Sequence, residues 1–201
     1  MPLLTNGMEV LAKLFGSAAR VKLLRLFLFN PKSAFTLKTA ADRTRTFTTV
    51  ARREISLFEK AGIVKRKSGR GKGGPSFSLI DDAAYLTPLQ NLFSSVPVRS
   101  KDVAKLIRKT GDVKLIVVAG LFIGDTDGCV DVLVVGDKIR GKRLANVMHS
   151  VEADLGKEIR YTVLSTENFK YRLGLYDKLM RDIVDYPHQV IYDRLHVSLT
   201  P

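Results

Sequence analysis

The sequence predicts an α+β protein with two domains that differ in their pattern of apolar residues. Up to about residue 80, apolar residues recur at helical spacing and are followed by two short β-type runs around a glycine-rich tip. After residue 100, strongly apolar runs alternate with helical segments, which predicts a small mixed sheet covered by helices. The 201 residues suffice for two such domains. We place them at residues 8–80 and 100–201, joined by a connecting helix and linker over 81–99.

Three helices and a hairpin are predicted in the N-terminal domain. A short helix over 10–15 precedes a second one over 18–30, which Ser17 is placed to cap and whose buried face carries Val21, Leu24 and Leu28. Further helices are expected over 35–44 and 47–60, with Gly62 ending the latter, and β-type runs over 63–67 and 76–80. This order of elements is that of a winged helix-turn-helix.

Positive charge is concentrated in the N-terminal domain. Residues 1–80 hold 16 Lys and Arg against 4 Asp and Glu, whereas residues 81–201 hold 17 against 16. A basic domain joined to a nearly neutral one indicates a polyanionic partner for the basic part. Membrane phospholipid is the alternative, but the sequence shows no basic amphipathic helix. We therefore expect double-stranded DNA as the partner, and no membrane.

The predicted helix over 47–60 has two distinct faces. Its buried stripe is expected to consist of Phe47, Ala51, Ile55 and Phe58, which recur at three- or four-residue spacing. The opposite face suits the major groove, where arginine pairs with guanine and threonine contacts phosphate or a thymine methyl group. It carries Thr48, Thr49, Arg52, Arg53 and Ser56, of which the two arginines are the main candidates. The alternative is an ordinary solvated helix face.

The hairpin carries a basic, glycine-rich tip, SGRGKGGP. Arg70 and Lys72 lie on this tip, and Lys65, Arg66 and Lys67 lie at its base. Such a wing is expected to bind phosphates or enter the minor groove, with an affinity that falls as salt rises. No Lys-Ser or Lys-Thr follows the glycines, so the tip is not a Walker loop. The alternative is a loop whose charge only keeps the protein in solution.

Two stretches, LAKLFGSAARVKLLRLFLFNPKSAF and ARREISLFEKAGIVKRK, resemble the winged helix of ArsR-like transcriptional regulators. In that family a leucine-rich helix precedes the recognition helix, and a segment like EKAGIV leads into the wing. The resemblance implies a DNA-binding transcriptional regulator, and such proteins commonly bind palindromic sites as homodimers. The cysteines with which some members sense metals are absent, so metal sensing is not implied.

The C-terminal domain is expected to alternate helices with strands. Helices are predicted over 100–110, 141–155 and 166–185, strands over 113–122, 130–136 and 159–165, and an extended piece over 188–193. Within it, VVAGLFIGDTDGCVDVLVVGD is similar to the signature of minimal nucleotidyltransferases of the polymerase-beta type. In that family a strand ends in Gly-Ser and the next opens with Ser-Asp-x-Asp, whose carboxylates hold the Mg²⁺ ions that bridge a triphosphate.

This chain departs from the nucleotidyltransferase signature at most positions. Gly120 matches the glycine, Cys129 replaces the first metal-binding aspartate, and Asp131 retains the second. A third carboxylate would lie on 159–165, which holds none. Because Mg²⁺ prefers oxygen ligands, the resemblance implies a degenerate domain without transferase activity, metal or cofactor. At most a vestigial pocket for nucleotide or Mg²⁺ would remain, at Gly120, Gly124, Cys129 and Asp131.

Other roles for the C-terminal domain stay open. Asp125 and Asp127 form an Asp-x-Asp of their own and could join Asp131 in an active nucleotidyltransferase, although turn residues are the plainer interpretation. The chain could also be an antitoxin-like component of a toxin–antitoxin pair, since minimal nucleotidyltransferases resemble components of such pairs. In a regulator, this domain would supply dimerisation, ligand sensing, or a surface for a nucleotide or protein partner.

The cellular compartment is suggested by what the chain lacks. No apolar run approaches the ~20 residues of a membrane helix, and MPLLTNGMEV has no basic leader region. A single cysteine, Cys129, allows no intramolecular disulfide. A cytoplasmic protein is therefore expected.

Overall fold

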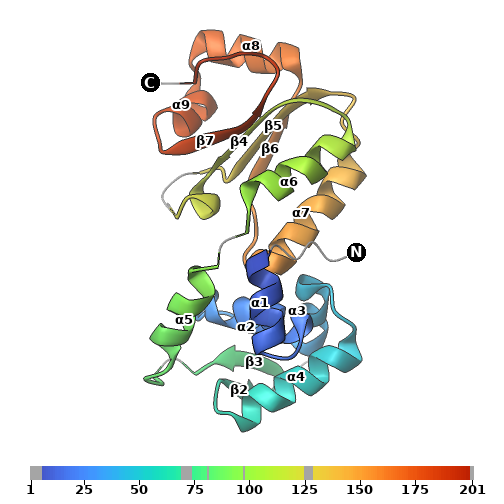
Figure 1. The fold of residues 1–201 in the computed structure, drawn as a ribbon, viewed down its shortest axis with the longest axis vertical. Helices are drawn as coiled ribbons and strands as arrows, with labels where there is room; N and C mark the ends of the chain where they lie inside the picture. The colour runs from blue at the N-terminus through green and yellow to red at the C-terminus, as the bar shows by residue number, and fades with distance from the viewer. Residues whose placement is uncertain (1–5, 69–73, 81, 97, 125–128, 200–201) are drawn as a thin grey trace. The chain divides into compact units, whose positions relative to one another are not determined.

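The fold is described from a computed structural model that covers residues 6–68, 74–80, 82–96, 98–124 and 129–199 (Figure 1). Within these residues the protein is α+β, with two small sheets. The chain divides into two compact units: unit 1 contains residues 1–98 and 149–158, and unit 2 contains residues 99–148 and 159–201. Unit 1 thus holds a segment, 149–158, that the sequence places in the middle of the C-terminal domain.

The helices of unit 1 form where the sequence predicts them, with shifted ends. They are α1 (Asn6–Leu14), α2 (Ala18–Leu28), α3 (Leu37–Thr44), α4 (Thr48–Lys60) and α5 (Leu86–Ser94). Ser17 caps α2 as predicted, because its hydroxyl accepts a hydrogen bond from the amide of Arg20 at 3.4 Å. Gly62, at φ +72°, follows α4 in the left-handed conformation expected after a helix end.

The connecting helix predicted within residues 81–99 forms as α5, and it begins later than the start of that segment. It begins at Leu86 and places Pro88 in its first turn. Proline is tolerated there, but further inside a helix its ring would clash with the carbonyl four residues earlier. The proline therefore favours a late start for this helix.

The sheet of unit 1 has three antiparallel strands. In the order β1–β3–β2, these are β1 (Ala34–Thr36), β3 (Ser76–Leu79) and β2 (Val64–Lys67). The predicted hairpin is confirmed as β2 and β3, whereas β1 was not predicted. Strand β1 has only three residues, and the last of them, Thr36, already caps α3, so the strand is too short to show a sequence period.

A single hydrophobic cluster connects these helices and strands. Val21, Leu24 and Leu28 of α2 are buried in it as predicted, together with Ala51, Ile55 and Phe58 of α4. Phe47 is the exception, since the prediction that it lies in the buried stripe is wrong. Its side chain is 82% exposed because it lies at the N-cap of α4, one residue before the helix, where the helical period no longer directs it inward.

Residues 149–158 belong to unit 1 through specific contacts with α2. Asp154 pairs with Lys22 at 2.8 Å, and its carbonyl accepts a hydrogen bond from the buried guanidinium of Arg25 at 3.0 Å. Burial lowers the pKa of Arg25 to about 10, although the charge of Asp154 acts against this shift. Gly156 approaches so closely that a Cβ atom there would lie 2.6 Å from the backbone carbon of Arg25. These contacts fix residues 149–158 against α2.

Unit 2 is built on a four-stranded mixed sheet. In the order β6–β5–β4–β7, the strands are β6 (Tyr161–Leu164), β5 (Val132–Asp137), β4 (Asp112–Ala119) and β7 (His188–Asp193). Strands β5 and β6 are parallel, whereas β4 is antiparallel to both of its neighbours. Beyond β4, the predicted strand end is replaced by a short 3-10 segment, Gly120–Phe122, which starts at a glycine with φ +51°.

Helices cover this sheet, as the apolar strands predict. They are α6 (Ser100–Ile107), extended by a 3-10 turn at Arg108–Thr110, α8 (Thr166–Leu175) and α9 (Lys178–Val184), while α7 (Gly141–Leu155) begins in unit 2 and ends in unit 1. Leu115 and Val117 of β4 pack in one cluster with Phe169 of α8 and Ile183 of α9. Figure 1 shows α6 on the opposite side of the sheet from α8 and α9.

The single helix predicted over 166–185 is wrong, because the chain breaks it into α8 and α9. Tyr176 adopts the left-handed conformation at φ +48°, which ends α8. Asp177 then caps α9 by accepting a hydrogen bond from the amide of Met180 at 3.0 Å. The hydrogen bond from the Asp177 cap therefore stabilises the start of α9 and compensates for the helical hydrogen bonds that are lost where α8 ends.

Candidate functional site

The solvent-facing side of α4 presents all five polar residues predicted for it. Thr48, Thr49, Arg52, Arg53 and Ser56 are exposed. Arg52 makes no hydrogen bond or ion pair within the described part of the chain. The N-cap of α4 also makes no side-chain hydrogen bond, so no capping side chain engages the amide groups of the first turn. These amide groups and the guanidinium of Arg52 are therefore not bound by an acceptor side chain of the described residues.

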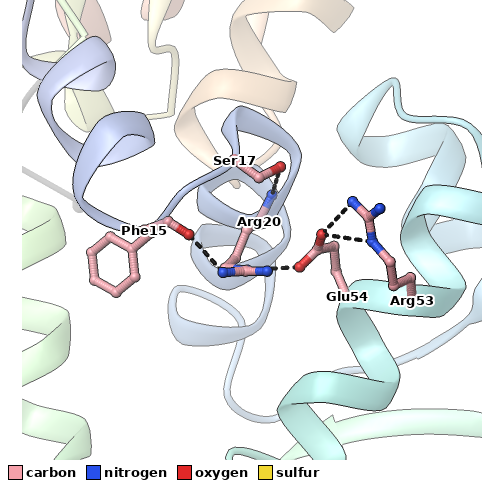
Figure 2. Close-up of polar contacts among 5 residues, drawn as sticks. All are labelled: Phe15, Ser17, Arg20, Arg53 and Glu54. Atoms are coloured by element: carbon pink, nitrogen blue, oxygen red, sulfur yellow. Dashed lines mark hydrogen bonds and ion pairs between the residues drawn. The ribbon is translucent and has the colours of Figure 1, made fainter.

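Arg53 differs from Arg52 because it is bound to a buried carboxylate. Glu54, whose side chain is fully buried, lies between two guanidinium groups, as Figure 2 shows. Arg20 of α2 donates from Nε to Glu54 Oε2 at 2.7 Å, and Arg53 donates from Nη2 to Glu54 Oε1 at 2.9 Å. Arg20 also donates from Nη1 to the carbonyl oxygen of Phe15 at 2.7 Å. Two nitrogens of the Arg20 guanidinium are thus held by hydrogen bonds.

The electrostatics of this group leave one net positive charge near the surface. Burial raises the pKa of Glu54, but hydrogen bonds and charges from Arg20 and Arg53 more than offset this, so the pKa lies below its ordinary value of 4.5. Glu54 is therefore ionised at neutral pH and balances one of the two arginines. Sequence periodicity missed Glu54, although a glutamate in line with the apolar positions of α4 was the available signal.

The hairpin residues do not all face the same way. Arg66 on β2 lies opposite Phe77 on β3, and both line a groove of 560 Å³. Lys65 and Lys67, also exposed, alternate with Arg66 along β2 and point to the other side of the sheet. Arg70 and Lys72 lie outside the described residues.

The groove brings α4 and the hairpin together at one surface. Thr48, Arg52 and Ser56 of α4 line it along with Arg66, while Ile55 and Phe77 supply apolar surface and Glu59 a single negative charge. Lys38 of α3 also lines the groove, so three cations and two hydroxyl groups from elements separated in sequence meet at one concave surface. Such a combination suits a polyanion with polar and apolar edges.

A second predicted site, in unit 2, is centred on Asp131. This buried residue lies just before β5, and its carboxylate oxygens are already engaged by donors. Arg160 donates from Nε to Oδ2 and from Nη2 to Oδ1, each at 3.0 Å, and its amide donates to Oδ2 at 2.8 Å. The amide of Leu121 donates to Oδ1 at 3.1 Å. An arginine therefore holds this carboxylate in a bidentate pair.

Burial raises the pKa of Asp131, but the hydrogen bonds and charge of Arg160 and the amide of Leu121 outweigh it, so the pKa is below its ordinary value. Sequence reasoning missed Arg160. Its signal lies in strand register, because Val132 pairs with Tyr161 in the parallel strands β5 and β6, which places the preceding residues Asp131 and Arg160 side by side.

The other predicted residues of this site differ in how far they are exposed. Cys129 is exposed, Gly120 is buried and Gly124 is exposed, while Asp125 and Asp127 lie outside the described residues. Among the residues that the structure describes, no three His, Cys, Asp or Glu side chains are grouped to hold a metal ion. The same residues include no helix long and apolar enough to cross a membrane.

Comparison with protein-family models, curated proteins and solved structures finds no match to this chain.

Proposed function

We propose that unit 1 is a winged helix-turn-helix that binds double-stranded DNA, and that the protein is a DNA-binding transcriptional regulator. Helix α4 would enter the major groove, with the β2–β3 hairpin as the wing against the phosphate backbone. The proposal agrees with the resemblance of two stretches of the sequence to ArsR-like regulators.

One observation carries this proposal. Arg52, Thr48 and Ser56 on α4 share a groove with Arg66 on the hairpin, and all four are at least partly accessible to solvent. Residues 1–80 hold 16 Lys and Arg against 4 Asp and Glu, so the surrounding field also favours a polyanion. Arginine and hydroxyl side chains on an accessible helix face are the groups that pair with base edges and phosphates.

For unit 2 we propose a role without nucleotidyl transfer. The support is the bidentate pair between Arg160 and Asp131, since a carboxylate engaged by four donors has little capacity left for Mg²⁺. This unit would instead serve dimerisation, ligand sensing or partner binding in a homodimeric regulator. A homodimer would also match the two-fold symmetry of a palindromic DNA site.

The test is fluorescence anisotropy with a labelled duplex of random sequence, measured over a series of salt concentrations. Wild type is expected to bind with an affinity that falls steeply as salt rises. Arg52→Ala is expected to lose about tenfold in affinity, because it removes a cation that makes no competing ion pair.

The matched control is Arg181→Ala, which removes an equal charge from an exposed position on α9 in unit 2. It should bind duplex DNA like wild type. If wild type does not bind duplex DNA even at low salt, or if the two variants lose affinity equally, the proposal is wrong.

A further inference from the structure

The most exposed large apolar side chain in the described part of the chain is Phe47, at 82%. A single exposed apolar residue is common on protein surfaces and needs no explanation by itself. Phe47, however, is the N-cap of α4, directly before Thr48 and Thr49 on the proposed DNA-binding face. Its position beside the proposed DNA-binding face, more than its exposure, suggests that Phe47 has a function.

Local structure gives no reason for a phenylalanine at this position. Helix N-caps favour Ser, Thr, Asp or Asn, because their side chains accept hydrogen bonds from the first-turn amides. Ser17, Thr36, Ser165 and Asp177 fill this role for other helices of the chain. Phe47 makes no such bond, and it is not among the apolar residues packed against the core of unit 1. The side chain of Phe47 therefore contributes to neither the cap nor the core.

The chemistry of the neighbouring surface indicates what Phe47 can contact. The N-terminal residues of a recognition helix are those that reach base edges in the major groove. Each base pair there presents hydrogen-bonding groups, which phenylalanine cannot use, and thymine alone adds an apolar group, its C5 methyl. Phenylalanine is one of the side chains that contact this methyl group.

We propose that Phe47 recognises a thymine methyl group in the major groove and so determines which base the protein prefers at one position of its DNA site. This inference rests on the proposed function. Arg52 on α4 would supply the polar contact, and Phe47 at the N-cap of the same helix would supply the apolar one.

The experiment uses the full chain and a duplex selected by wild type from a random library. Each thymine of that duplex is replaced in turn by deoxyuridine, which removes only the methyl group, and affinities are measured by fluorescence anisotropy. For wild type, we expect one position at which the replacement weakens binding about fourfold, the effect of one buried methyl group. Phe47→Ser should bind the thymine duplex about tenfold more weakly and show no discrimination at that position.

Thermal unfolding separates recognition from a structural role. Because serine is a good N-cap, Phe47→Ser is expected to raise the melting temperature by about 2 °C while DNA affinity falls. A residue needed for the fold would lower both. Leu57→Ser is the matched control, since Leu57 is a 43% exposed apolar residue on the same helix, and it should leave discrimination unchanged.

The outcomes separate this inference from the proposed function. If Arg52→Ala weakens binding but Phe47→Ser keeps wild-type affinity and thymine preference, the DNA-binding proposal stands and this inference is overturned. Equal responses of wild type and Phe47→Ser to deoxyuridine at every position would also overturn it. If wild type binds no duplex at all, both fail together.

Discussion

Glu54 links the exposed face of α4 to the interior of unit 1. Its carboxylate accepts hydrogen bonds from Arg20 on α2 and from Arg53 on α4. One edge of the Arg53 guanidinium is therefore committed to the protein, whereas Arg52 has no such partner in the described residues. The two neighbouring arginines, equal candidates in the sequence, are thus expected to contribute unequally to DNA binding, with Arg52 the stronger.

Glu54 also predicts a dependence of stability on pH. Its pKa in the folded protein is below the ordinary value of 4.5, so its stabilising effect is complete above that pH and is lost as pH falls through the folded pKa. Glu54→Gln is expected to lower the free energy of unfolding at pH 7 by about 2 kcal/mol, because Arg20 loses its charged partner.

Urea denaturation of wild type and Glu54→Gln, followed by circular dichroism at pH 7, 5 and 3.5, would check this prediction. The difference in free energy of unfolding between wild type and Glu54→Gln should decrease only at pH values below 4.5, the ordinary pKa of a glutamate. A difference that stays constant down to pH 3.5 would show that the charge of Glu54 does not stabilise the fold.

Asp131 predicts how unit 2 responds to metal. Because Arg160 and two backbone amides occupy its oxygens, Mg²⁺ at millimolar concentration is expected to leave the melting temperature unchanged, with or without added nucleoside triphosphate. Differential scanning fluorimetry with and without a chelator measures this. A rise in melting temperature that depends on Mg²⁺ and disappears in Asp131→Asn would favour the nucleotidyltransferase interpretation instead.

At the scale of elements, the helix and strand pattern was largely predictable because its signals are local. Ser17 and Gly62 mark helix ends through their own side chain or backbone conformation, and the β2–β3 hairpin follows from two β-type runs around glycines. Three features were not predictable in this way. Strand β1 is too short, Phe47 lies one residue beyond the helical period, and the break between α8 and α9 depends on a single capping aspartate.

The site required knowledge of the sheet as well as of each element. Alternation along β2 separates Arg66, which faces the groove, from Lys65 and Lys67. The pair of Asp131 and Arg160 depends on the parallel register of β5 and β6. Both arrangements depend on how residues distant in sequence are placed in a sheet. The composition and residue spacing of a single element do not reveal this placement.

We expect the cations of the β2–β3 hairpin to contribute to the salt dependence of DNA binding. Arg66→Ala/Lys67→Ala removes two exposed cations from β2, and each phosphate contact contributes about 0.9 to the slope of log K against log salt. We expect the slope to decrease in magnitude by about 0.9, the contribution of Arg66, which faces the groove, and by more if Lys67 also contacts a phosphate, with affinity reduced similarly for all duplex sequences.

A salt titration of this variant beside Lys170→Ala/Lys178→Ala would test the role of the hairpin. The control removes the same charge from exposed positions in unit 2 and should keep the wild-type slope. An unchanged slope in the hairpin variant would mean that β2 does not lie against the phosphates.

At the scale of the whole molecule, the two compact units do not follow the order of the sequence. Residues 149–158 belong to unit 1, where Asp154 pairs with Lys22 and Gly156 lies against the backbone of Arg25. Residues 149–158, which the sequence places within the predicted C-terminal domain over 100–201, are thus assigned to unit 1. These contacts could not be predicted, because neither the periodicity of α7 nor its composition specifies a partner more than a hundred residues away.

This division predicts which part of the chain Asp154 stabilises. Asp154→Ala is expected to destabilise unit 1 by about 2 kcal/mol, since it leaves the partly buried ammonium group of Lys22 without its partner. Native-state hydrogen exchange should show lost protection in α2 and unchanged protection in β4 and β5. Loss of protection confined to β4 and β5 would contradict the assignment of residues 149–158 to unit 1.

The most direct test of the central claim, that unit 1 binds duplex DNA through α4 and the hairpin, is a comparison of amide NMR spectra of the full chain with and without a duplex. We predict that the largest chemical-shift changes fall on residues 47–56 and 64–67, and that they are much reduced in Arg52→Ala at the same DNA concentration. Changes confined to unit 2, or no change at low salt, would contradict the claim.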